Sequence, residues 1–167
     1  MAGHIVVVGL MGVGKSTVGR LVAKHLGLAF LDNDDLLTVN AGGTAEQLAT
    51  TQGLAALHRL EAEVLAHALD DPGPTVLAAA ASVVTGEDGR AALRKARHVV
   101  WLRDDLAVIT ARVGGSGQFH RPDFSPEVLR RIERERRPLF ASVATVAVDI
   151  EGQAPEQVAD RVIRALR

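Results

Sequence analysis

The stretch of sequence that decides the fold is IVVVGLMGVGKS, residues 5–16. Its first four residues are β-branched, and such a continuous run is typical of a strand that is buried on both faces. The remaining residues match the pattern G-x-x-x-x-G-K-[ST], and a helical period follows over Lys15–Leu26. A glycine-rich turn between a buried strand and a helix is the context in which this pattern forms a phosphate-binding loop.

The residues of this loop have separate chemical roles. Glycines let the backbone turn tightly and direct successive N–H groups at phosphate oxygens. Lys15 places a point charge against the β- and γ-phosphates, and Ser16 offers a hydroxyl to Mg²⁺. No N-K-x-D motif for recognising guanine is present, which disfavours a GTPase. The loop therefore predicts that a nucleoside triphosphate is bound by Gly12, Val13, Gly14, Lys15, Ser16 and Thr17.

The rest of the chain alternates short aliphatic runs with longer helical periods. Besides residues 5–8, strands are predicted over Ala29–Leu31, Thr75–Ala79, His98–Leu102 and Val143–Asp149. Helices are predicted over residues 15–26, 34–40, 44–51, 54–69, 89–96, 105–113 and 155–166, and onward from Ser125-Pro126, an N-cap followed by proline. This order predicts one α/β domain over residues 1–167, with a five-stranded parallel sheet and helices on both faces.

The glycine-rich stretch Gly114-Gly115-Ser116-Gly117 is predicted to break the helix that begins at Asp105. The polar segment over about residues 114–124 has two interpretations, a surface loop and a mobile lid. The phosphate-binding loop favours the lid, because such a site has to exclude water during phosphoryl transfer.

Composition excludes several classes of protein. The 167 residues are 47% hydrophobic and 23% charged, which is ordinary for a globular domain. With 19 basic and 20 acidic side chains the net charge is −1, so neither nucleic acid nor a membrane surface is an expected partner. The absence of cysteine excludes disulfides and thiolate metal sites. No apolar run is long enough to span a bilayer and no signal peptide is present, so a cytoplasmic monomer is expected.

Three segments together resemble the shikimate kinase family. They are GLMGVGKSTVG at Gly9–Gly19, FLDND at Phe30–Asp34 and RRPLF at Arg136–Phe140. The resemblance implies a P-loop fold like that of the nucleoside monophosphate kinases, with a five-stranded parallel sheet and a lid. It also implies transfer of the γ-phosphoryl group of ATP, with Mg²⁺, to a hydroxyl of shikimate.

The resemblance further implies roles for single residues. Asp34 would hold the acceptor hydroxyl and act as the base beside Lys15, and Asp32 would join Ser16 around Mg²⁺. Two aspartates before a helical run can also be helix caps. By the same resemblance, the lid arginine that closes over the phosphates is Arg121, the arginine that pairs with the acceptor carboxylate is Arg136, and the residues that flank adenine are Arg112 and Pro155. The last two have equally plain alternatives, a solvated helix residue and a proline at the start of a helix.

The acceptor side departs from the family pattern within Leu57-His58-Arg59-Leu60-Glu61, although the family's glutamate is kept as Glu61. The family has phenylalanine and arginine at the first two of these positions. Arg59 is not a substitute for the missing arginine, because adjacent helix positions point about 100° apart. One hypothesis is that Glu61 raises the pKa of His58, and the alternative is an ordinary surface histidine.

A second departure follows the third strand, where the family has Gly-Gly-Gly and this chain has Ala80-Ala81-Ser82. Methyl groups fill space that glycine leaves open, and a positive φ becomes costly. The acceptor site is thus predicted to be reshaped while the ATP site is intact. Its predicted residues are Asp34, His58, Ala80, Ala81, Ser82 and Arg136.

These features leave three functional hypotheses for a protein with a small-molecule acceptor. The leading one is an ATP- and Mg²⁺-dependent kinase of the shikimate kinase type, acting on shikimate or a closely similar metabolite. The second is a divergent sugar-acid or cyclitol kinase with the same fold. The third is a nucleotide-binding protein that has lost acceptor chemistry. The arginine-rich stretch at residues 130–137 is interpreted as a salt-bridged helix, because glutamates interrupt it.

Overall fold

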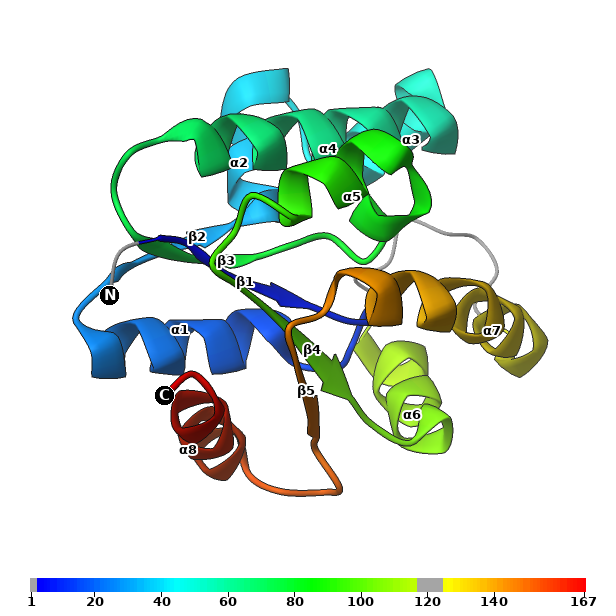
Figure 1. Ribbon diagram of the computed structural model, residues 1–167. Coiled ribbons are helices and arrows are strands. Elements are labelled where there is room, and N and C mark those ends of the chain that lie inside the picture. Colours follow the sequence, from blue (N-terminus) through cyan, green and yellow to red (C-terminus); the bar gives the residue numbers. More distant parts are fainter. Residues whose placement is uncertain (1–2, 117–124) are drawn as a thin grey trace.

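The computed structural model describes residues 3–116 and 125–167 (Figure 1). Five parallel strands form one sheet in the order β2-β3-β1-β4-β5. The strands are β1 (Ile5–Val8), β2 (Ala29–Asp32), β3 (Thr75–Ala78), β4 (His98–Arg103) and β5 (Val146–Asp149). All four residues of β1 are buried, as its continuous apolar run predicts for the central strand of a covered sheet. The predicted five-stranded α/β fold is confirmed.

Eight helices and one 3₁₀ turn are found in the described part of the chain. They are α1 (Lys15–Leu26), α2 (Asn33–Ala41), α3 (Ala45–Gln52), α4 (Leu54–Asp70), η1 (Val83–Thr85), α5 (Glu87–Leu93), α6 (Leu106–Ser116), α7 (Pro126–Val143) and α8 (Pro155–Ala165). Figure 1 shows α1 and α8 on one face of the sheet and α2 to α5 on the other. In the same view, α6 and α7 lie near the end of the sheet to which the arrows of β1 and β4 point. None of the described helices is long and apolar enough to cross a membrane.

Local sequence signals set several helix ends. Helix α1 ends at Gly27, whose φ of 66° is the left-handed conformation that glycine adopts freely at a C-terminus. Helix α7 begins after Ser125, whose hydroxyl accepts a hydrogen bond from the Val128 N–H, and Pro126 follows at the first position, as predicted. Strand β2 runs directly into α2, with Asp32 as the N-cap.

Three predicted elements have wrong boundaries. The helix predicted over residues 89–96 is α5, which begins at Glu87 and ends at Leu93. The fifth strand begins at Val146, because α7 continues to Val143, whose side chain is buried in the core. Helix α6 continues through Gly114 to Ser116 and is not broken at residue 114. A glycine inside a helix costs only about 1 kcal/mol, and the buried Val113 anchors this last turn against the core. The rest of the predicted lid, with Arg121, lies outside the described residues.

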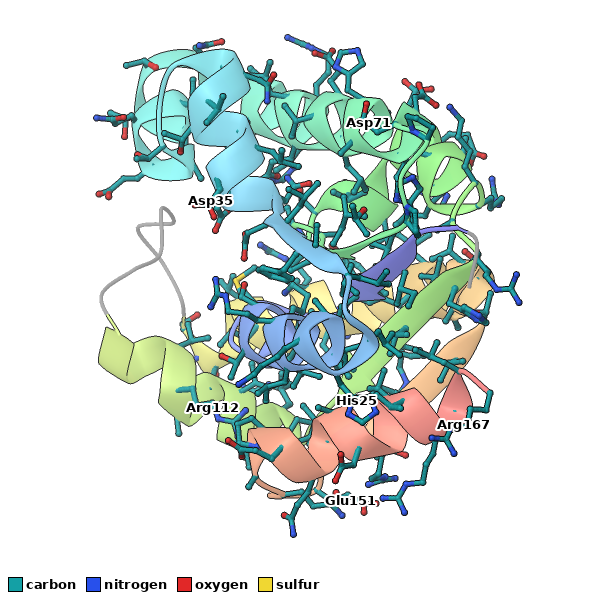
Figure 2. All side chains as sticks on the ribbon, turned by 90° about the vertical axis from the view of Figure 1, so that its left-hand side faces the viewer. His25, Asp35, Asp71, Arg112, Glu151 and Arg167 are labelled. Carbon is teal, nitrogen blue, oxygen red and sulfur yellow. The ribbon has the colours of Figure 1, made fainter. Side chains whose placement is uncertain are left out.

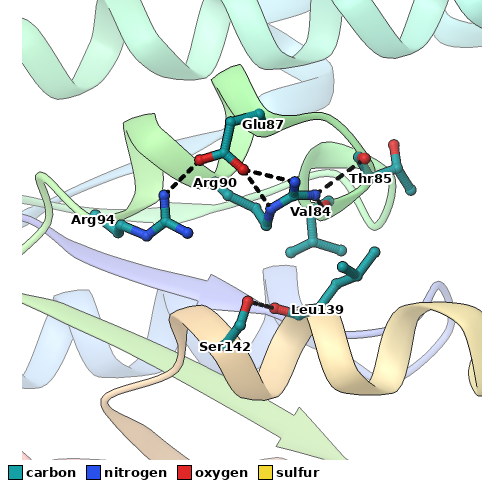
Figure 3. A network of polar contacts seen from close by, with 7 residues as sticks. All are labelled: Val84, Thr85, Glu87, Arg90, Arg94, Leu139 and Ser142. Carbon is teal, nitrogen blue, oxygen red and sulfur yellow. Dashed lines mark hydrogen bonds and ion pairs between the residues drawn. The ribbon is translucent and has the colours of Figure 1, made fainter.

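Helix α5 holds the short turn η1, which the sequence did not predict. The Arg90 guanidinium donates to Val84 O at 2.6 Å and to Thr85 O at 3.1 Å, and it pairs with Glu87 (Figure 3). Behind this contact the backbones meet closely, since a Cβ added at Gly89 would lie 2.0 Å from Val83 O. Helix α5 therefore fixes the chain directly after residues 80–82.

We expect Gly89→Ala to destabilise the protein by about 1–3 kcal/mol, because the new methyl group would force α5 and η1 apart. Gly73→Ala is the matched control, since an added Cβ there meets open space, and it should change stability by less than about 0.5 kcal/mol. Urea denaturation of both variants measures the difference. Equal stabilities would contradict the close contact between α5 and η1.

Candidate active site

The candidate site is an open cavity of about 740 Å³ beyond the carboxyl ends of β1, β2 and β3. In an open parallel sheet, ligands bind at this edge where the strand order reverses, and here the chain leaves β1 toward β2 and later crosses to β4. Its lining residues come from the phosphate-binding loop, six helices, the ends of β2 and β3 and the segments that follow: Met11, Gly12, Gly14, Lys15, Ser16, Thr17, Asp32, Asn33, Asp34, Thr44, Ala45, Glu46, His58, Glu61, Ala78, Ala79, Ala80, Ala81, Ser82, Arg112 and Arg136.

Most of the predicted nucleotide-binding residues lie along one side of this cavity. Gly12, Gly14, Ser16 and Thr17 line it. The side chain of Val13 is instead buried in the hydrophobic core, so that only the backbone of this residue is available to a phosphate.

The ammonium group of Lys15 lies beneath the loop. Its Nζ donates to Gly9 O at 3.0 Å and to Leu10 O at 2.9 Å, which uses two of its three N–H groups and leaves the third for a phosphate oxygen. Burial lowers the pKa of Lys15 to about 8, although the carboxylates of Asp34 and Asp32 act in the opposite direction. Lys15 therefore remains mostly charged at neutral pH in a poorly hydrated place, where a point charge acts strongly on an anion.

Asp32 connects the starts of α1 and α2 through its two oxygens. The Ser16 hydroxyl donates to Oδ2 at 2.5 Å, and the Asp34 N–H donates to Oδ1 at 3.0 Å. The helix cap that the sequence left open as an alternative is thus Asp32, while Asp34 lies in the first turn of α2 and lines the cavity.

Ser16 and Asp32 are suited to a magnesium ion. A hydroxyl and a carboxylate are hard oxygen ligands, and Mg²⁺ in phosphoryl-transfer sites takes one or two protein ligands beside phosphate oxygens and water. Within residues 3–116 and 125–167, no three His, Cys, Asp or Glu side chains are grouped so that they could hold a metal by themselves. The donor set therefore fits an ion that arrives with a nucleotide.

At the other side of the cavity, Ser82 and Glu61 form a buried hydrogen bond in which the Ser82 hydroxyl donates to Glu61 Oε2. Burial raises the pKa of Glu61 to about 7, and the bond from Ser82 opposes this rise. Asp34 raises the same pKa further, while Arg136 and Lys15 lower it. From the sequence, Glu61 is a residue shared with the family and a neighbour of His58, but its place among the cavity residues was missed.

His58 lines the cavity and is half-buried on α4. Arg59 points away from it, to an exposed ion pair with Glu63 at 3.9 Å, as the geometry of adjacent helix positions predicts. Leu57 does not belong to the acceptor site as the sequence suggested. It is absent from the cavity wall and packs in a separate core cluster with residues of α2 and α3, including Leu37 and Leu48.

The segment Ala80-Ala81-Ser82 lines the cavity without backbone strain. The expected cost of positive φ angles does not arise, because in the described chain Glu151 is the one non-glycine residue with positive φ. Instead the segment makes an ordinary turn, in which Val83 N donates to Ala80 O at 3.2 Å and Ser82 has a φ of −81°. The segment therefore places two methyl groups and a hydroxyl in the wall of the cavity without straining the backbone.

Two arginines approach the cavity from α6 and α7. Arg136 is buried on α7 and lines the cavity as predicted. Arg112 on α6 also lines it, and Figure 2 labels this residue in the lower part of the view and Asp35, the neighbour of Asp34, in the upper part. Pro155 is the first residue of α8 and is not among the described residues of the cavity wall.

The raised pKa of Glu61 gives the stability of the protein a testable dependence on pH. Between the usual value of 4.5 and about 7, the folded chain keeps a proton that the unfolded chain has lost. The contribution of Glu61 to the free energy of unfolding therefore falls as pH rises through this range, by about 3 kcal/mol in total.

We expect Glu61→Gln to gain stability relative to wild type as pH rises from 4.5 to 7, because the amide cannot ionise and still accepts from Ser82. Urea denaturation between pH 4.5 and 7 measures this difference, in a range where Lys15 stays mostly protonated. Glu63→Gln, an exposed position on the same helix, is the control and should run parallel to wild type. Parallel curves for both variants would show that Glu61 has no raised pKa.

Comparisons with known proteins agree with this geometry. A family profile described as shikimate kinase matches residues 11–167. The chain is 34% identical to a shikimate kinase of Symbiobacterium thermophilum, over 98% of this chain and 96% of that protein. It is 36% identical to a shikimate kinase of Paramagnetospirillum magneticum, over 97% of this chain and 83% of the other.

A solved structure extends the likeness to three dimensions. The shikimate kinase from Acinetobacter baumannii, solved in complex with shikimate, superposes with a TM-score of 0.89 and 28% identity, over 97% of this chain and 91% of the other. The profile match covers most of the sequence, and the fold and the P-loop residues agree with it. The chain belongs to the shikimate kinase family.

Proposed function

We propose that the protein is an ATP-dependent kinase that transfers the γ-phosphoryl group of ATP to a hydroxyl of shikimate or of a closely similar small metabolite. One observation supports this most directly. A single cavity contains Lys15, the pair of Ser16 and Asp32, Asp34 and Arg136, so that one site offers groups for phosphate, metal, hydroxyl and carboxylate.

The nucleotide half of the cavity would bind ATP by its phosphates. Backbone N–H groups at Gly12 and Gly14 and the N-terminus of α1 would surround the phosphate oxygens. Lys15 would contact the β- and γ-phosphates with its remaining N–H group. Mg²⁺, held by Ser16 and Asp32, would offset the negative charge on the transferred group.

In the acceptor half, Asp34 is the proposed base. As the acceptor oxygen bonds to the γ-phosphorus, the bond from that phosphorus to the bridging oxygen breaks and ADP leaves. The proton of the acceptor hydroxyl passes to the Asp34 carboxylate. Arg136 would bind the acceptor carboxylate, and its burial strengthens such a pair. The proposal also includes the expectation from the sequence that the protein is a monomer in the cytoplasm.

The acceptor end keeps a second candidate open, a kinase for a sugar acid or a cyclitol. Ser82 and Glu61 occupy this end with a hydroxyl and a carboxyl group, where the family has a glycine backbone beside the acid. A hydroxyl and a carboxyl group both form hydrogen bonds with the hydroxyls of a polyol. The acceptor is therefore best identified by direct assay.

We expect ADP release from ATP and Mg²⁺ to depend on shikimate, and Asp34→Asn to lower kcat at least about a hundredfold, because the variant lacks the base. Asp35→Asn, the exposed neighbour that does not line the cavity, should retain activity. A coupled assay with shikimate, gluconate and a set of cyclitols measures the rates. Turnover with another acceptor alone would favour the second candidate, and ATP binding without any turnover would contradict both kinases.

Replacing His58 by arginine should lower the KM for shikimate roughly tenfold, because a guanidinium makes a bidentate, charge-assisted pair with the carboxylate that an imidazole cannot make. His67→Arg is the matched control, since His67 is exposed on the same helix and does not line the cavity. A KM that is unchanged, or that rises, in His58→Arg would place the acceptor carboxylate away from residue 58.

A further inference from the structure

A carboxylate outside the residues discussed so far is buried at the start of the segment that leads into α6. Asp104 follows the last residue of β4, and its side chain is only 1% exposed. Its Oδ1 accepts from Asp105 N at 3.0 Å, and its Oδ2 lies 3.2 Å from Nη1 of Arg112. Because an ionised carboxylate is costly to bury without a cation, the pairing with Arg112 is what compensates for the burial of Asp104.

The same arginine nitrogen also reaches the phosphate-binding loop. Arg112 Nη1 donates to Gly12 O at 3.4 Å, so one nitrogen of the guanidinium is shared between Asp104 and the loop backbone. The side chain is still 44% exposed and lines the cavity. One nitrogen of the planar group is thus held, while part of its surface faces the cavity in which a nucleotide would lie.

Packing between α6 and the loop supports this arrangement independently of charge. Gly12 has a φ of 77°, and a Cβ added there would lie 3.0 Å from Cγ2 of Val113. Val113 is buried in the core next to Arg112 in sequence. Helix α6 therefore lies against the loop through an apolar contact and a polar one, and the polar contact is directed by Asp104.

We propose that Asp104 is a positioning residue of the nucleotide site, which holds Arg112 against the phosphate-binding loop so that its guanidinium plane meets the bound nucleotide. This inference rests on the proposed function in so far as that function requires a nucleotide. Without Asp104, the arginine side chain samples many rotamers, and ordering it on binding costs free energy. Because the Asp104 carboxylate orders the arginine side chain before the nucleotide binds, this cost does not arise on binding.

The test is the dissociation constant of ADP, measured by calorimetry for wild type, Asp104→Asn, Arg112→Ala and the double variant. We expect each single change to raise the dissociation constant roughly three- to tenfold, and the double variant to be no weaker than Arg112→Ala. Asp70→Asn is the matched control, since it breaks an exposed ion pair with Lys95 far from the cavity and should bind ADP as wild type does.

Non-additivity separates positioning from mere stabilisation. If Asp104 only stabilised α6, Asp104→Asn would lower the melting temperature and leave ADP binding unchanged. Alternatively, Asp104→Asn would weaken ADP binding further in the Arg112→Ala background. Either result would overturn the inference. Because Arg112→Ala leaves Asp104 buried without its cation, Arg112→Lys is a second variant that keeps a positive charge. It should fold stably and still bind ADP more weakly than wild type.

The outcomes also distinguish this inference from the proposed function. Unchanged ADP affinity in Asp104→Asn rejects the positioning role and does not contradict the proposed kinase activity. Reduced affinity together with no turnover of any acceptor supports the positioning role and rejects the kinase. A wild-type protein that does not bind ADP overturns both.

Discussion

The carboxylate of Asp32 is the contact on which the arrangement of the site depends. One of its oxygens accepts from Ser16 at the start of α1, and the other accepts from the Asp34 N–H at the start of α2. Two helices that leave different strands are thereby tied at one point of the sheet edge. This tie fixes the distance between the phosphate-binding loop and Asp34, which a phosphoryl transfer requires to be short and constant.

The cavity balances buried charges of both signs, and its two halves do so differently. In the nucleotide half, Lys15 is offset by backbone carbonyls and by the carboxylates of Asp32 and Asp34. In the acceptor half, Glu61 is partly neutralised by its raised pKa and by a hydroxyl, with Arg136 nearby. A nucleotide therefore meets a buried cation, whereas an acceptor meets the carboxyl group of Glu61, whose protonation changes close to neutral pH.

How much the sequence could predict depended on whether a feature was local. The phosphate-binding loop, the N-cap at Ser125 and the burial of β1 follow from short patterns, and the structure has them at the expected positions. The helix break at Gly114 was wrong because tertiary packing overcame a weak propensity. The bond between Ser82 and Glu61 joins residues 21 positions apart, and no periodicity signals such a contact. Asp104 was missed for the same reason, since only the fold brings Arg112 to it.

The bond between Ser82 and Glu61 has a consequence for the history of the acceptor site. Removing the hydroxyl would leave a buried carboxyl group without this partner, and that is costly. An arginine at position 58 would lie one helical turn from Glu61 and could supply a new partner. The two departures from the family pattern, at positions 58 and 82, are therefore coupled through one acid. The effect of reverting position 58 or position 82 therefore depends on the residue at the other position. The order in which the two substitutions occur then matters.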